Sequence, residues 1–406
     1  GAAFSLSGQS QFDGFDPATF ARADTLDSSR NRLSAGRLWI SGGDSDEGLS
    51  GTIAASLLGS SNRNLLDGEQ INRTRGNRRN ATGQIAYRFA TGAIRHAALL
   101  ALEHEREEFH ARDTVFGGFS NQDRQRSRQA ITGEWRAELA PVIVDLALRK
   151  DVFSAFKDAT TLRASALVAL GSGLSLAGSY AEGIAQPTFF DLFGFFPGSF
   201  VGNPELGPES SRGVEASLRY RRGALHAALT GYRQRLGDEI VDMFDPATFL
   251  SSTVNRDGRS RRSGIEAELG WSPGERLRLT AYYAFLDSDE PGRAPATQLR
   301  EVRRPRHSGS VAADGTSGRL TYGASLAHAG ARLDTNFDVF PARRVRLKPY
   351  WLASGRLAYS VGPGLELFVR GSNLFDARYQ DVFGYRTEGR ALYAGVSLRA
   401  DRRSSP

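Results

Sequence analysis

Histidine and carboxylate side chains, common ligands of metal ions, gather in one short segment, Glu103–His110. A zinc site needs ligands that converge on one point, whereas consecutive side chains of a strand point alternately to opposite sides. On a strand, Glu103 and Glu107 share one side, and His104 and His110 share the other. Charges on both sides are typical of a strand that has left an apolar environment, so the pattern favours a solvated rim over a metal site.

A second group of carboxylates lies near the start of the chain and consists of Asp13, Asp16, Asp24 and Asp27. Oxygen-rich loops bind Ca²⁺, but aspartate is also a common turn residue. Turn formation is the more frequent reason for such residues, and the spacing leaves both alternatives open.

The signatures of several enzyme classes are missing from the sequence. Because the chain has no cysteine, thiolate metal sites, a cysteine nucleophile and a disulfide framework are excluded. No Gly-x-Ser-x-Gly segment occurs and no glycine is followed by lysine, which excludes a nucleophile elbow and a P-loop. We expect neither an enzyme nor a bound cofactor.

Segment 184–209 is rich in phenylalanine and reads IAQPTFFDLFGFFPGSFVGNPELGPE. Exposing so many aromatic rings is unfavourable unless they pack on something. One alternative is a loop that packs on itself, and the other is an apolar surface that contacts a ligand. The predicted ligand contacts in this segment are Phe193, Phe195, Phe196, Phe200 and Asn203.

Arginine is concentrated in three short stretches that flank long polar segments. A basic patch can indicate a nucleic-acid partner. At strand ends, however, arginine pairs with acidic neighbours or with the phosphates of a lipid surface, and we expect a solvated rim rather than nucleic-acid binding. The residues are Arg259, Arg261, Arg262, Arg303, Arg304, Arg306, Arg343, Arg344 and Arg346.

The composition limits the fold classes that could position these residues. Of the 406 residues 40% are hydrophobic and 24% charged, and the formal net charge is +7. No apolar run approaches the ~18 residues that a transmembrane helix needs, so a helical membrane protein is excluded.

Alternation of apolar and polar residues, which is typical of strands, recurs along the whole chain. In Leu365–Arg370, for example, Leu365, Leu367 and Val369 oppose Glu366 and Arg370. About 18 such strands are predicted, near residues 3–12, 30–41, 50–60, 78–89, 94–106, 126–138, 141–151, 160–170, 174–183, 210–221, 224–235, 260–271, 275–287, 303–313, 318–330, 349–360, 364–373 and 390–399.

The connections between these strands alternate in length. Short turns such as Ser272–Gly274 alternate with long polar segments, near 12–30, 61–77, 107–125, 184–209, 236–259, 288–302, 331–348 and 374–389. Outer-membrane barrels have short periplasmic turns and long extracellular loops, and only one face of each strand touches lipid. The pattern therefore predicts an all-β, antiparallel transmembrane β-barrel, with Glu266, Glu268, Arg356, Glu366 and Arg370 facing inward and Leu269, Leu357 and Leu367 facing lipid.

Several motifs, in a conserved order along 185–400, resemble those of TonB-dependent outer-membrane receptors. The matching segments are Ala185–Phe193, Gly202–Ser210 followed by Glu215, Asn255 with Gly264–Glu266, Arg304–His307, Asn373–Tyr379 and Gly384–Arg390. Within that family, Val382–Arg390 and the glycine-containing stretch before Gly202 look most like the vitamin B12 (cobalamin) receptor branch. Tyr385 joins the predicted ligand contacts through this resemblance.

The resemblance implies energy-dependent uptake of a scarce, bulky nutrient: cobalamin, a related corrinoid, a ferric siderophore or haem. It implies as partners this nutrient, the lipid bilayer with its lipopolysaccharide, and the TonB complex acting through a plug domain. Receptors of this kind have 22 strands and a plugged lumen. We expect residues 1–400 to be the C-terminal portion of the barrel, 401–406 a polar tail, and the plug and the first strands to be absent.

Two other hypotheses fit the same strands. One is a plugless, passive, porin-like barrel derived from such a receptor, since 16 to 18 strands can enclose a channel. The other is a soluble all-β module that binds a carbohydrate or polymer.

Overall fold

The computed structural model describes residues 1–11, 14–15, 22–44, 46–115, 117–196, 198–292 and 298–399. These residues form 27 strands and one short helix. Nineteen of the strands are assigned to the large antiparallel sheet, which confirms the all-β, antiparallel prediction of about 18 strands. The chain divides into unit 1 (1–165, 180–212 and 236–258) and unit 2 (166–179, 213–235 and 259–406), and each is described by itself.

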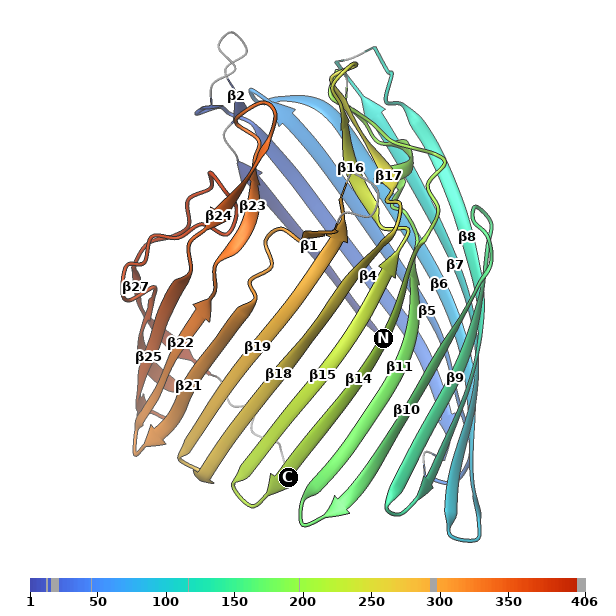
Figure 1. Ribbon diagram of the computed structural model, residues 1–406, viewed down its shortest axis with the longest axis vertical. Coiled ribbons are helices and arrows are strands. Elements are labelled where there is room, and N and C mark those ends of the chain that lie inside the picture. The colour runs from blue at the N-terminus through green and yellow to red at the C-terminus, as the bar shows by residue number, and fades with distance from the viewer. Residues whose placement is uncertain are drawn as a thin grey trace. The chain divides into compact units, whose positions relative to one another are not determined.

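The wall of unit 1 is a series of strands, each paired antiparallel with the next (Figure 1). Its strands reach 23 residues, about twice the 9–11 that cross a bilayer, so their outer halves extend beyond the membrane. They are β1 (Ala2–Gln11), β4 (Ser28–Gly43), β5 (Gly48–Leu66), β6 (Glu69–Thr91), β7 (Ile94–Asp113), β8 (Gln122–Leu139) and β9 (Val142–Phe153).

The prediction of a long loop at residues 61–77 is wrong. Strands β5 and β6 continue through it and meet at a two-residue turn, Asp67–Gly68, whose φ angles are +48° and +86°. Positive φ at both positions is the requirement of a type I′ hairpin turn, and Asp-Gly is a preferred sequence for it. The apolar alternation stops here because both faces of the pair lie outside the membrane, where polar residues such as Asn64 and Asn72 pair with each other.

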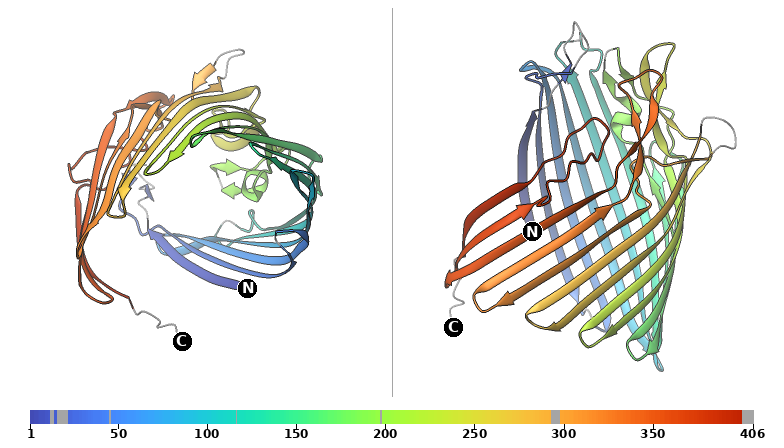
Figure 2. Two further views of the ribbon diagram at one scale, coloured as in Figure 1. Left: turned by 90° about the horizontal axis from the view of Figure 1, so that it is seen from below. Right: turned by 60° about the vertical axis from the view of Figure 1, so that its left-hand side comes forward.

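Predicted loops of unit 1 also contain their own short elements. These are β2 (Gly14–Phe15), β3 (Arg22–Ala23), α1 (Phe189–Phe193), β12 (Phe195–Phe196), β13 (Phe200–Val201), β16 (Ile240–Asp245) and β17 (Leu250–Asn255). The last four form a small sheet in the order β12-β13-β17-β16. Segments 184–209 and 236–258 are therefore folded together. Figure 2 (left) shows the green segment 189–201 on the concave side of the blue and cyan strands.

Unit 2 has the same kind of wall. Its strands are β18 (Arg259–Gly274), β19 (Leu277–Pro291), β20 (Gln298–Arg300), β21 (His307–Ser317), β22 (Leu320–Ala329), β25 (Tyr350–Gly362), β26 (Leu365–Ser372) and β27 (Ala391–Leu398). A hairpin of β23 (Arg332–Asn336) and β24 (Arg343–Leu347) fills the predicted loop 331–348. The orange to red strands of Figure 2 (right) are this part of the wall. Residues of β10 (Ala159–Gly171), β11 (Leu174–Ala185), β14 (Glu209–Arg222) and β15 (Leu225–Gly237) are divided between the two units.

The predicted alternation of faces is confirmed by the pairing register. Leu357 lies opposite Val369, whereas Arg356 lies opposite Arg370, so the apolar and the charged residues occupy different faces of β25 and β26. Leu357 and Leu367 are 56% and 47% exposed, which for large apolar side chains suits contact with lipid. Leu269 and Glu268 likewise lie on opposite faces of β18.

Within the described residues, no helix is long and apolar enough to span a membrane.

Candidate functional site

The phenylalanine-rich segment of unit 1 begins with a capped helical turn. The hydroxyl of Thr188 accepts a hydrogen bond from the amide of Asp191 at 3.1 Å, and the carboxylate of Asp191 accepts one from the amide of Thr188 at 2.8 Å. This reciprocal capping box satisfies two backbone donors that a helix start otherwise leaves unpaired. Residues 188 and 191, which resemble the family motif, therefore start α1.

Two of the predicted aromatic contacts, Phe196 and Phe200, pack on the ring of Phe190 in α1. The rings of Phe190 and Phe200 stack at 4.8 Å between centroids, and the ring of Phe196 lies 5.8 Å from Phe190. Phe189 stacks at 5.4 Å on Phe109, which belongs to the concave face of β7. These rings therefore pack within the folded loop or against the wall, as one of the two alternatives predicts. Their contact with a ligand stays a prediction.

Two arginines of β8 hold this segment to the wall. The guanidinium carbons of Arg124 and Arg126 lie 4.5 Å from the ring centres of Phe193 and Phe189, within cation–π distance. Arg126 also donates to the carbonyl of Pro187 at 2.7 Å and to Glu107 at 2.6 Å. Arg126 and Glu107 are both nearly buried, so each compensates the charge of the other, and Arg78 also donates to Glu107 at 2.8 Å.

The carboxylates of the Glu103–His110 segment are engaged in ion pairs. Glu103 accepts from Arg128 at 2.7 Å and from Arg149 at 3.0 Å, on the same face of β7 as Glu107. On the other face, His110 lies 2.5 Å from Asp123. In the described part of the chain no group of three or more His, Asp or Glu side chains could hold a metal ion.

Of the amino-terminal aspartates, Asp27 is buried and accepts a hydrogen bond from the amide of Asp67 at 3.0 Å. It therefore braces the β5–β6 turn. Asp24 is exposed, and Asp13 and Asp16 lie outside the described residues.

Asn203 connects the two folded loops of unit 1. Its side-chain amide donates to the carbonyl of Thr253 at 3.0 Å, and its side-chain oxygen accepts from the amide of Glu205 at 2.9 Å. Nearby, Asn255 both accepts from and donates to the backbone of Gly207. These motif asparagines stabilise the loops, so the resemblance at these positions has a structural basis.

A basic pocket of about 790 Å³ lies among the loops of unit 2. It is lined by four cationic side chains, one carboxylate (Asp376) and two aromatic rings (Tyr379 and Phe383). The cations are Arg346, Lys348, Arg378 and Arg386, and all four residues are exposed. Such a lining suits a bulky anionic ligand, because guanidinium groups bind carboxylate and similar oxygens through two hydrogen bonds and aromatic rings supply apolar contact area.

Loop 374–389, which supplies most of this pocket, is fixed by the Asn373–Tyr379 motif. The side chain of buried Asn373 accepts from the amide of Ala377 at 2.8 Å and donates to the carbonyls of Ala377 and Glu388. Asp376 accepts from the amide of Arg390 at 3.0 Å. Both ends of the loop are thereby held together at the start of β27.

The β23–β24 hairpin supports the same loop from the side. Arg332 is nearly buried and donates to the carbonyl of Gln380 at 2.6 Å and to Asp381 at 2.8 Å. Asp334, fully buried, accepts from the amide of Phe383 at 2.7 Å and from Arg303 at 2.8 Å. Burial alone would raise the pKa of Asp334, but the amides of Phe383 and Thr335 and the guanidinium of Arg303 outweigh it and lower this pKa below its usual range.

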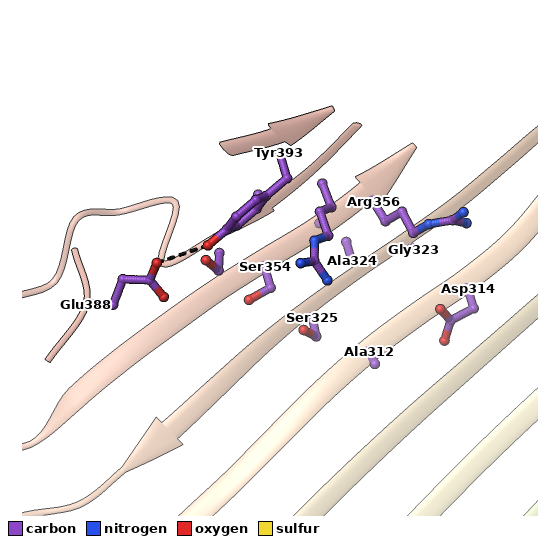
Figure 3. A pocket seen from close by; sticks show the side chains of 13 residues that line it. Ala312, Asp314, Gly323, Ala324, Ser325, Ser354, Arg356, Glu388 and Tyr393 are labelled. Atoms are coloured by element: carbon purple, nitrogen blue, oxygen red, sulfur yellow. Dashed lines mark hydrogen bonds between the residues drawn. The ribbon is translucent and has the colours of Figure 1, made fainter. Parts of the chain in front are cut away.

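A second cavity, of about 480 Å³, lies on the charged face of the unit 2 wall (Figure 3). Asp314, Arg356 and Arg370 line it together with Glu388 and Tyr393, and the Tyr393 hydroxyl donates to Glu388 at 3.0 Å. Glu388 thus lines this cavity, while its neighbours Thr387 and Gly389 line the basic pocket.

The predicted contacts fall into both units. Phe193, Phe195, Phe196, Phe200 and Asn203 lie together in unit 1, and Tyr385 lies in unit 2, 64% exposed and next to Arg386. Sequence reasoning missed the basic pocket: Arg346 was assigned to a solvated rim, and Lys348, Arg378 and Arg386 were not considered. The available signal was the run of four cations in segment 343–348, since loop 374–390 carries equal numbers of arginines and carboxylates.

Comparison with known proteins identifies a matching family and solved structures that resemble this chain. The family model described as "TonB dependent receptor-like, beta-barrel" matches residues 3–374. The siderophore receptor PirA from Acinetobacter baumannii is 17% identical with a TM-score of 0.75, covering 94% of this chain and 64% of its own. The iron transporter FrpB from Neisseria meningitidis is 12% identical with a TM-score of 0.78, covering 98% and 68%. The ferric-catecholate import receptor Fiu from E. coli is 14% identical with a TM-score of 0.72, covering 98% and 71%. The chain thus spans just under two thirds of the length of the PirA receptor.

Proposed function

Because the chain belongs to the TonB dependent receptor-like β-barrel family, whose members are bacterial outer-membrane proteins, we propose that it captures an anionic ferric siderophore at its extracellular loops for uptake. The observation that carries the proposal is the basic pocket, in which four cations face one carboxylate beside two aromatic rings. In this proposal transport beyond capture belongs to a plug segment and the TonB complex, as the family resemblance implies.

The charge and shape of the basic pocket indicate the class of ligand. A siderophore–iron complex is a compact chelate that presents carboxylate or catecholate oxygens, and Arg346, Arg378 and Arg386 provide forked donors for such oxygens. Tyr379 and Phe383 provide flat apolar surface next to those donors. PirA and Fiu, whose names state siderophore and ferric-catecholate binding, support the same class.

Cobalamin is the second candidate, and the resemblance of Val382–Arg390 to the cobalamin receptor branch favours it. A cobalamin receptor does not need four cations around its ligand, since the corrin carries mostly neutral amides. A passive porin-like barrel would need no selective pocket at all. The basic lining therefore supports the siderophore receptor over both.

Binding to the purified protein in detergent tests the proposal. A ferric catecholate, a ferric carboxylate siderophore and cobalamin are titrated separately, with quenching of tryptophan fluorescence as the readout. The double variant R378Q/R386Q is expected to weaken ferric siderophore binding about 100-fold, roughly tenfold for each lost charged hydrogen bond. The control R221Q/R222Q removes the same charge from the exposed end of β14 and leaves the affinity unchanged. Tight cobalamin binding without siderophore binding would overturn the proposal.

A further inference from the structure

The cavity of about 480 Å³ on the charged face of unit 2, here called the wall cavity, is built from residues in direct register. Opposite residues in an antiparallel pair have their Cα atoms about 4.5–5.5 Å apart and point to the same face. One such row crosses five neighbouring strands, β21, β22, β25, β26 and β27, and all of its members line the cavity. The row consists of Asp314, Gly323, Arg356, Arg370 and Tyr393.

A second row on the same face, two positions further along each strand, carries small side chains. Ala312 lies opposite Ser325, Ser325 lies opposite Ser354, and Ser372 of β26 continues the row. We call Ser325, Ser354 and Ser372 the serine row. Their hydroxyls have no hydrogen-bond partner in the part of the chain that the structure describes. The floor of the wall cavity therefore combines free space with three hydroxyls that can still donate and accept.

Two of the four charged groups that line the wall cavity already have partners. Arg356 pairs at 2.5 Å with Glu366, which lies outside the lining. Glu388 accepts a hydrogen bond at 3.0 Å from the hydroxyl of Tyr393, as the dashed line in Figure 3 shows. Neither group therefore needs an opposite charge from an occupant of the cavity.

The other two charged groups, Arg370 and Asp314, have no ion-pair partner among the described residues. The guanidinium carbon of Arg370 lies 4.6 Å from the ring centre of Tyr393, which stabilises the cation without neutralising it. A Cβ at Gly323 would lie 2.7 Å from Oδ1 of Asp314, so this carboxylate extends over the glycine. The cavity thus offers a group that only donates, a group that only accepts, and hydroxyls that do both.

These groups indicate the chemistry of an occupant. A simple anion would meet two carboxylates, and a simple cation would meet two guanidinium groups. Arg370 and Asp314 lie three strands apart, roughly 14 Å at about 4.8 Å per strand, which is too far for the adjacent charges of an amino acid. A ligand with many hydroxyls pairs with guanidinium, carboxylate and serine alike, because each hydroxyl both donates and accepts. The cavity volume is within the range of small-molecule sites.

We propose that the wall cavity binds a neutral saccharide of about two sugar rings, with its hydroxyls on the serine row and its ends at Arg370 and Asp314. Two linked rings bridge the separation of these end groups, and the exposed ring of Tyr393 supplies an apolar surface for the C–H face of one sugar. No residue that lines the wall cavity also lines the basic pocket. The proposal is therefore independent of siderophore capture.

The test is calorimetric titration of maltose into the purified protein, held in a polyoxyethylene detergent because its head group contains no sugar. The variant S325A/S354A is expected to bind maltose about 25-fold more weakly than wild type, about fivefold for each lost hydrogen bond. The control S310A/S360A removes two serines from the same face of the wall outside the cavity lining and keeps wild-type affinity. A312F, which places a ring in the cavity without removing a hydroxyl, should abolish binding.

Acetate and glycine, titrated in the same way, are expected not to bind. Absence of maltose binding by wild type would overturn the proposal, and so would equal maltose affinity of wild type and S325A/S354A. Binding of acetate or glycine in preference to maltose would indicate an anion or zwitterion site and would also overturn it. Thermal melting followed by circular dichroism checks that each variant is folded. Siderophore titration of S325A/S354A should match wild type, which keeps the two proposals separate.

Discussion

The carboxylate of Asp334 accepts a hydrogen bond from the backbone amide of Phe383, with 2.7 Å between Oδ2 and the nitrogen. These residues lie 49 positions apart in the chain and on different loops of unit 2. Through this contact the β23–β24 hairpin determines the position of a pocket residue, because Phe383 lines the basic pocket and Asp334 lies outside it. The basic pocket of unit 2 is thus built by a loop and by the hairpin that supports it.

Replacing Asp334 by asparagine is expected to loosen loop 374–389 without changing the pocket lining. The amide group of asparagine places a donor where the carboxylate accepts from Phe383, Thr335 and Arg303. The free energy of local opening should fall by about 2 kcal/mol, the typical value of a hydrogen bond to a charged group. Hydrogen exchange of the peptide 380–386 measures it. D257N, at an exposed turn, is the control, and unchanged exchange in D334N would refute the supporting role.

The same contact makes the loop sensitive to acid. The pKa of Asp334 is lowered in the folded protein, whereas an unfolded aspartate titrates near ~3.9. A lowered pKa contributes stability that is complete above the unfolded value and is lost as the pH falls through the folded value. Protection of peptide 380–386, corrected for intrinsic exchange, should be constant from pH 7 to pH 5 and fall below about pH 4. D334N should show no such fall, and a loss near pH 6 would assign the effect to another group.

Gly202 should not tolerate a side chain. A Cβ at this position would lie 2.7 Å from the backbone nitrogens of Gly194 and Phe193, which cannot move away without unwinding the end of α1. G202A is expected to destabilise the phenylalanine-rich segment by about 1–3 kcal/mol, the usual cost of overpacking. Hydrogen exchange of segment 190–203 is the measurement. G231A, where a Cβ meets nothing within 4 Å, is the matched control.

Variants of the two phenylalanines of β12 distinguish a role in ligand contact from a role in loop packing. Replacing Phe195 and Phe196 by alanine is expected to weaken ligand binding by the purified protein, because both rings belong to the predicted apolar contact surface. F119A, which removes a highly exposed ring elsewhere in unit 1, should leave affinity unchanged. If F195A/F196A binds as tightly as wild type, these rings serve packing alone.

The substitution L367R should destabilise the barrel in lipid. Leu367 is the third of the eight residues of β26 and lies on its apolar face, where a charged side chain meets hydrocarbon. The expected loss is about 2–4 kcal/mol of unfolding free energy in vesicles, measured by denaturant titration. E268R places arginine on the charged face of β18 and should cost much less. Equal losses for the two variants would mean that the face assignment is wrong.

The strands could be predicted from sequence because alternation is a local signal. It failed at residues 61–77, where the alternation of apolar residues stops although the pairing continues. Outside the membrane neither face needs apolar side chains, so polar pairs such as Asn64 and Asn72 replace them. The Asp67–Gly68 turn was the remaining local evidence that β5 and β6 form a hairpin there.

The basic pocket could not be predicted because it depends on contacts between distant segments. Arg346 and Arg386 line one cavity since Arg332 holds Asp381 and Asp334 holds Phe383. None of these partners is recognisable from spacing. The phenylalanine-rich segment was identified by composition, yet its fold depends on Asn203 reaching Thr253, 50 residues away.

Glu388 lines the wall cavity while its two neighbours line the basic pocket, so one peptide segment contributes to the lining of both. A bulky occupant that pushes Thr387 outward must carry Glu388 with it and lengthen its bond to Tyr393. A shift of residues 387–389 would therefore change the lining of both cavities.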